Sequence, residues 1–193
     1  MDDLKKTEIL DRGLELILKK GYFGTGIQEI ADRSGIPKGS FYNYFKSKEQ
    51  FAIELLDHCV RGILEQLVEV LTDDAIPSIQ RLERLHKGVS YEHIRKGFES
   101  FGYLASILSL EMAHTDGPVV KALNQAFERI KEPLRRCLQE ARDAGSIDPK
   151  LDVAKLAEFI QNAWYGALVR TRASDSFIPL DSFYEMSMEL LRK

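Results

Sequence analysis

The most informative stretch of this sequence is Gly35-Ile-Pro-Lys-Gly-Ser-Phe-Tyr-Asn-Tyr-Phe-Lys-Ser-Lys-Glu49. From Arg33 to Lys48 the chain carries four basic residues and no acidic one, although the whole chain has a formal net charge of -3. An acidic protein does not coat nucleic acid or anionic membrane through its bulk charge, so a nucleic-acid contact must come from a local patch. This basic, tyrosine-bearing stretch is the candidate for that patch.

Helix signals begin well before this stretch. Apolar residues at steps of three and four predict an amphipathic helix over 4–20, which a glycine then stops. Thr25 and Gln28 have the spacing of a capping box and predict the start of a short second helix. The turn residues Ser34-Gly35 end that helix after two turns.

The stretch itself predicts a third helix and the start of a fourth. Pro37 sets a helical φ for the first turn of the third helix, which continues to Phe45. Ser47 and Gln50 repeat the capping-box spacing and open a long helix over about 48–71. Two short helices joined by a turn, braced by a helix on each side, form a helix-turn-helix pattern.

The rest of the chain shows helical periodicity and no sustained period-two alternation, so we expect an all-α protein. The domain organisation follows from the long fourth helix, within which a small N-terminal bundle (1–52) passes into a larger C-terminal bundle (53–193). The further predicted helices cover about 78–88, 91–114, 118–144, 152–173 and 180–192.

The third helix has two faces with different chemistry. Phe41 and Phe45 are four residues apart and share one face, which favours core packing. Lys38 and Tyr42 form a pair on another face and are expected to point outward. With Ser40, they offer donors to phosphates and base edges.

Three more positions have a physical reason to meet DNA. Gly39 lacks a Cβ, so a partner backbone can come close beside it. Lys48 lies in the first turn of a helix, where the dipole disfavours a cation, and a bound phosphate would remove that conflict. Thr25 and the backbone amides that follow it can hold a second phosphate.

The segment from Gly21 to Glu49 closely resembles the DNA-binding domain of the tetracycline-repressor (TetR) family, and the resemblance covers about residues 4–52. It implies an all-helical homodimer, usually a transcriptional repressor, that a small molecule bound in the C-terminal domain releases from operator DNA. Carried over by position, the resemblance makes the following residues the DNA-contacting set: Thr25, Lys38, Gly39, Ser40, Tyr42, Tyr44 and Lys48.

The sequence departs from the family pattern in places. Family members often have a hydroxyl residue where this chain has Gly26 and a serine where it has Pro37, which removes one phosphate contact and one side-chain cap. The segment from Gly102 to Ala113 is similar to a C-terminal type that senses reactive or carbonyl-type compounds. A cysteine can follow the glycine in that group, but Tyr103 stands here, so a thiol sensor at this position is not supported.

The C-terminal region offers candidates for an effector pocket and a dimer interface. Residues with an apolar body and a polar tip are the pocket candidates: Tyr103, His114, Trp164, Tyr165 and Arg170. Ala163 and Ala167 allow two helices to approach closely, and in the family the last two helices pair with those of a second copy. The apolar stripes expected beside them contain Leu156, Ile160, Phe183, Met186 and Leu190.

Several classes of protein are disfavoured. Cys59 and Cys137 are far apart, with no CxxC pair and no histidine at metal-ligand spacing, so neither a disulfide framework nor a metal site is indicated, and no cofactor is implied. The N-terminus does not resemble a signal peptide, and no apolar run is long enough to span a bilayer. We therefore expect a cytoplasmic protein.

The sequence favours a ligand-responsive transcriptional regulator, a repressor that leaves a pseudo-palindromic operator when a small molecule binds. Two alternatives stay open from the residues alone. One is a small-molecule-binding helical adaptor that does not bind DNA. The other is an enzyme, although the sequence contains no GxSxG, HExxH or phosphate-binding loop.

Overall fold

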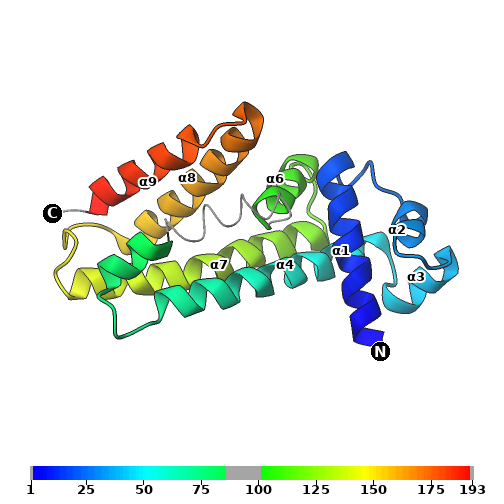
Figure 1. Cartoon of the computed structure of the whole chain (residues 1–193), viewed down its shortest axis with the longest axis horizontal. Coiled ribbons are helices and arrows are strands. Elements are labelled where there is room, and N and C mark those ends of the chain that lie inside the picture. The colour runs from blue at the N-terminus through cyan, green and yellow to red at the C-terminus, as the bar shows by residue number, and fades with distance from the viewer. Residues whose placement is uncertain (1, 86–100, 192–193) are drawn as a thin grey trace. The chain divides into compact units, whose positions relative to one another are not determined.

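The computed structural model describes residues 2–85 and 101–191, and every regular element in those ranges is an α-helix (Figure 1). This confirms the all-α prediction. No described helix is long and apolar enough to cross a membrane. The helices are α1 (Asp2–Lys20), α2 (Ile27–Arg33), α3 (Lys38–Tyr44), α4 (Lys48–Leu71), α6 (Phe101–Glu111), α7 (Pro118–Asp143), α8 (Val153–Ser174) and α9 (Ile178–Leu191), together with a helical segment at 78–85.

The chain divides into two compact units. The described part of the first unit consists of residues 2–61 and 101–126, and that of the second consists of 62–85 and 127–191. Helices α4 and α7 each contribute residues to both units. The first unit therefore contains the predicted helix-turn-helix together with α6, which lies far along the sequence.

The core of the first unit is built around an aromatic cluster of Phe41, Phe45 and Phe51, all of them essentially inaccessible to solvent. The ring centroids of Phe41 and Phe45 are 5.2 Å apart, and those of Phe45 and Phe51 are 5.1 Å apart. A Cβ at Gly13 of α1 would lie 2.2 Å from the Phe51 ring, so only glycine lets α1 pass this close. The cluster thus joins α1, α3 and α4.

The helix boundaries confirm one capping prediction and correct another. Ser47 caps α4, because its Oγ accepts from the Gln50 backbone N–H at 3.0 Å. The capping box predicted at Thr25 and Gln28 is wrong. Gly26 is the N-cap of α2 and makes no side-chain cap, because the Thr25 hydroxyl is instead bonded within the preceding turn.

Farther along, α6 ends at Glu111, whereas the sequence predicted a helix to His114. The residues from Met112 to His114 form a turn instead. The predicted stretches 91–100 and 86–88 lie outside the described residues. The last helix pair agrees with prediction, and Asp152 caps α8 by accepting from the Ala154 and Lys155 amides.

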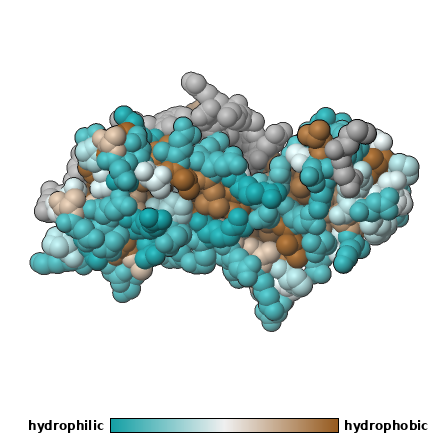
Figure 2. All heavy atoms as spheres, turned by 90° about the horizontal axis from the view of Figure 1, so that it is seen from below, coloured by the Kyte–Doolittle hydropathy of each residue, from teal (hydrophilic) through white to brown (hydrophobic). Residues whose placement is uncertain are grey.

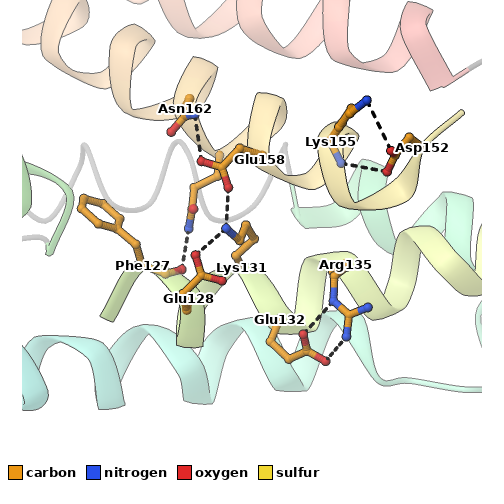
Figure 3. Close-up of polar contacts among 10 residues, drawn as sticks. Phe127, Glu128, Lys131, Glu132, Arg135, Asp152, Lys155, Glu158 and Asn162 are labelled. Carbon is orange, nitrogen blue, oxygen red and sulfur yellow. Dashed lines mark hydrogen bonds and ion pairs between the residues drawn. The ribbon is translucent and has the colours of Figure 1, made fainter. Parts of the chain in front are cut away.

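In the second unit, polar contacts connect α7 to α8 (Figure 3). Lys131 pairs with Glu128 on its own helix and with Glu158 on α8. The Gln161 amide donates to the Phe127 carbonyl at 3.0 Å. Both glutamates are well exposed, so these ion pairs contribute little to stability, and apolar burial along α8 holds the helices together.

Arg81 joins three segments of the second unit and is almost fully buried. Its guanidinium donates to the Leu71 carbonyl at 2.6 Å, where α4 ends, and to the Ile76 carbonyl at 2.9 Å. It also pairs with Glu140 of α7 at 2.8 Å. One side chain therefore satisfies the carbonyl end of α4 and ties it to α7.

We predict that Arg81→Met lowers the free energy of unfolding by roughly 2–4 kcal/mol, because it leaves two carbonyls unpaired at about 1–3 kcal/mol each. Urea unfolding followed by circular dichroism measures the change. The matched control is Arg84→Met, an exposed arginine in the same helical segment, which should change little. Equal effects of the two variants would contradict the assignment.

Candidate nucleic-acid interface

Helix α3 presents the two faces that the sequence predicted. Phe41 and Phe45 are 0% and 1% exposed and fix one face of the helix to the core. Lys38 and Gly39 are exposed, and Tyr42 is 49% exposed. A helix held by its buried aromatic face leaves these three residues available to a partner.

The remaining α3 residues flank this exposed face. Ser40 and Tyr44 are half-buried, and the Tyr44 ring lies beside Phe45 with centroids 6.4 Å apart. A Cβ built on Gly39 would meet no atom within 4 Å, so the surface there is open. A nucleic-acid backbone can approach this part of α3 without displacing protein atoms.

The turn before α3 sets the angle between the two short helices. Gly35 has a φ of +65°, a conformation that favours glycine, and the Ile36 amide donates to the Ala31 carbonyl at 3.0 Å. The Lys5 ammonium of α1 donates to the Ser34 carbonyl at 2.8 Å. Pro37 is the N-cap of α3 and makes no side-chain cap, as its chemistry requires.

Thr25 is fully buried, although it belongs to the predicted DNA-contacting set. Its hydroxyl donates to the Gly21 carbonyl at 2.7 Å, and its amide donates to the Tyr22 carbonyl at 3.2 Å. Gly26 beside it is exposed and has open space where a side chain would be. In this structure the Thr25 side chain shapes the turn that leads to α2.

Lys48 is also engaged by the protein itself. Its ammonium donates to the Tyr22 carbonyl at 2.5 Å and lies 4.3 Å from the centroid of the Tyr22 ring. Burial lowers the pKa of Lys48, and the charge of Glu111 acts in the opposite direction. Arg33, another cation of the acid-free stretch, pairs with Glu15 of α1 at 3.1 Å.

The sequence did not indicate these acidic partners. Glu15 lies 18 residues before Arg33, with which it pairs. Glu111 lies 88 residues beyond Phe23 and accepts a hydrogen bond from the Phe23 backbone amide. No local spacing connects such pairs, because only the packing of α1, α2 and α6 brings them together. The exposed cations of the stretch are Arg33, which pairs with Glu15, together with Lys38 and Lys46.

The predicted pocket residues fall into two groups. In the first unit, Tyr103 is buried within α6, and His114 is exposed in the turn that follows that helix. In the second unit, the Trp164 and Tyr165 rings are 4.8 Å apart, and Arg170 is exposed. Two of the expected pocket residues, His114 and Arg170, are therefore exposed to solvent.

Phe127 of α7 was not in the predicted set, but its ring lies 5.2 Å from that of Tyr165. Burial raises the pKa of the Tyr165 hydroxyl further above its ordinary value. Among the residues that the structure describes, no group of three or more metal-ligating side chains comes together.

Comparison with known proteins gives matches along most of the chain. Residues 9–55 match the profile of bacterial regulatory proteins of the tetR family, and residues 79–186 match a tetracyclin repressor-like C-terminal domain. The chain is 29% identical over 186 residues to the HTH-type transcriptional repressor DhaR of Mycobacterium sp. strain GP1, covering 96% of this chain and 91% of that protein. It is 25% identical over 177 residues to the repressor NemR of Escherichia coli K12, covering 92% and 88%.

The fold is also found among solved structures. The crystal structure of the regulatory protein TetR from Rhodobacter sphaeroides superposes with a TM-score of 0.87 and 27% identity, covering 97% of this chain and 98% of that one.

We predict that neither cysteine reacts quickly with a thiol reagent at pH 8 in the native protein. Burial raises the pKa of Cys59 to about 12 and that of Cys137 to about 11, so very little thiolate, the reactive form, is present at that pH. Labelling by Ellman's reagent in buffer and in denaturant measures this. Rapid native labelling of either thiol would contradict the prediction.

Proposed function

We propose that α3 reads operator DNA, since this chain belongs to the tetR family of bacterial regulatory proteins and is a ligand-responsive helix-turn-helix transcriptional repressor. Membership makes it a regulator and not an enzyme. The observation that supports the proposal is the division of α3 into a buried phenylalanine face and an exposed face with Lys38, Gly39 and Tyr42.

Each residue of the proposed interface has a role suited to its chemistry. Lys38 supplies charge to phosphate or to a guanine edge, and Gly39 lets the DNA backbone approach. Tyr42, Tyr44 and Ser40 supply hydroxyl groups of different reach. Thr25 and Lys48 flank this set, where their turn and helix ends meet phosphates once DNA is bound.

We assign DNA binding to residues 1–52, and effector binding and dimerisation to 53–193. Within the second unit, Trp164 and Tyr165 are the proposed effector contacts, because together with Phe127 they offer an aromatic surface with a hydroxyl donor. The exposed side chains of His114 and Arg170 do not contribute to such a surface. The effector weakens DNA binding, and by linkage DNA weakens effector binding to the same degree.

The proposed dimer surface lies on the exposed sides of α8 and α9. Phe159, Ala163 and Gly166 follow one another at helical spacing on α8, and Phe159 is 55% exposed. On α9, Ile178 and Met186 are 71% and 59% exposed. Such large apolar side chains on adjacent helices are typical of an isologous interface.

Three residues of the expected interface stripes are instead buried within their own unit. Leu156, Ile160 and Phe183 are 5%, 3% and 9% exposed. They lie on the sides of α8 and α9 that face the core of the second unit. The surface drawn in Figure 2 is mostly hydrophilic, and hydrophobic residues are seen on it only in narrow strips.

Selection of bound DNA from a random double-stranded pool tests the proposed function. A dimer should enrich a pseudo-palindrome whose half-site centres are about 34–36 Å apart, or a multiple of that distance. An adaptor that binds small molecules without DNA would enrich no sequence, and that result would overturn the proposal. The enriched sequence then provides the operator for all later binding measurements.

We predict that Lys38→Ala weakens binding to the selected operator by roughly tenfold, about 1.4 kcal/mol, because one charged contact is lost. Fluorescence anisotropy over a salt series measures it. If Lys38 contacts a phosphate, its loss would also reduce the slope of log K against log salt concentration by about 1 per protomer. If it contacts a base, its loss would relax sequence specificity at one base pair of the operator. Lys19→Ala, an exposed lysine outside the proposed interface, is the control and should keep wild-type affinity.

We predict that Met186→Glu shifts the protein from dimer to monomer, because the interface would bury an unpaired carboxylate. Sedimentation velocity at micromolar concentration measures the shift. Ala154→Glu introduces the same charge on an exposed position of α8 away from the proposed face and should stay dimeric. Equal behaviour of the two variants would place the interface elsewhere.

A further inference from the structure

Glu111, the last residue of α6, accepts a hydrogen bond from the turn that leads into the helix-turn-helix. Its Oε2 lies 2.9 Å from the backbone nitrogen of Phe23. Phe23 is 63% exposed, so this amide belongs to a turn at the protein surface. A surface amide is a group that nucleic-acid phosphates use, and here a carboxylate of the same chain occupies it.

The turn is shaped to receive this carboxylate. Gly21 has a φ of +80°, and a Cβ built on it would lie 2.0 Å from Glu111 Oε1. Any other residue would be strained and would also displace the carboxylate. One oxygen of Glu111 therefore lies against the Gly21 backbone while the other accepts from Phe23.

Lys48 is bound to the same turn. Its ammonium donates to the Tyr22 carbonyl, between the two residues that Glu111 touches, and lies over the Tyr22 ring. Glu111 is near enough for its charge to act on Lys48. The cation proposed to meet a phosphate is thus partly buried beside an internal anion.

We propose that Glu111 is an autoinhibitory contact, which occupies the Phe23 amide and holds a negative charge close to the turn that binds Lys48, in competition with operator phosphate. The inference rests on the proposed DNA-binding function. A carboxylate and a phosphate both accept strong charge-assisted hydrogen bonds from amides and ammonium groups, so they compete for the same donors. Removing the carboxylate leaves the turn and Lys48 ready for DNA.

The test is the affinity of Glu111→Gln for the operator obtained by selection. Glutamine has nearly the same size but no charge, and its neutral amide oxygen is a weaker acceptor for the Phe23 amide than a carboxylate, so the variant weakens the competing contact without removing the side chain. We expect operator affinity to rise about tenfold, the equivalent of one additional charge-assisted contact. The salt dependence should steepen by about 1 per protomer, because one more phosphate is neutralised.

Asp116→Asn is the matched control, because it removes the same charge from an exposed position of the same compact unit. It should leave affinity unchanged. A gain equal to that of Glu111→Gln would mean a general charge effect and would overturn the proposal. In a Lys48→Met variant, the further change Glu111→Gln should raise operator affinity much less. The full rise of about tenfold in that variant would show that Glu111 does not act through Lys48.

The outcomes distinguish failure of the proposed DNA-binding function from failure of the autoinhibitory contact. If the wild-type chain enriches no DNA, the proposed function fails and the contact has nothing to inhibit. If the wild type binds but Glu111→Gln binds equally or more weakly, only the autoinhibitory contact fails. Glu111→Ala, checked for folding by thermal denaturation, is the second variant and should also bind more tightly than the wild type.

Discussion

The packing of Phe41, Phe45 and Phe51 is the contact on which the helix-turn-helix part of the first unit depends. Helix α3 has seven residues, too few to be stable alone, so its place in the protein comes from its buried aromatic face. Phe51 of α4 packs against Phe41, and Gly13 allows α1 to pack closely on the same Phe51 ring. Because these rings fix the rotation of α3, they also decide that Lys38 and Tyr42 face outward.

Around this apolar anchor, two residues expected to meet DNA, Thr25 and Lys48, and the neighbouring cation Arg33 are bonded within the protein. Thr25 closes its own turn, Arg33 pairs with Glu15, and Lys48 binds the Tyr22 carbonyl beside Glu111. A group that already has a partner must exchange it to bind phosphate, so part of the contact energy is offset. The proposed function therefore makes DNA affinity depend on internal competitors as well as on the residues proposed to touch DNA.

Local patterns in the sequence predicted the fold well, and distant contacts account for what they missed. The bounds of α4 and the two faces of α3 follow from helical periodicity and caps, which involve neighbouring residues. The sequence could not reveal that Glu111 reaches Phe23, because packing alone joins them. Nor could it separate the core side of α8, with Ile160, from the exposed side, with Phe159, since both are apolar.

The claim that α3 meets DNA through the face opposite its phenylalanines can be tested directly by NMR. Isotope-labelled protein would be titrated with the selected operator while backbone amide shifts are followed. The account predicts the largest changes across α3 from Lys38 to Tyr44, with smaller ones at the start of α2. Unchanged α3 amides, with the shifts confined to residues 127–191, would contradict it.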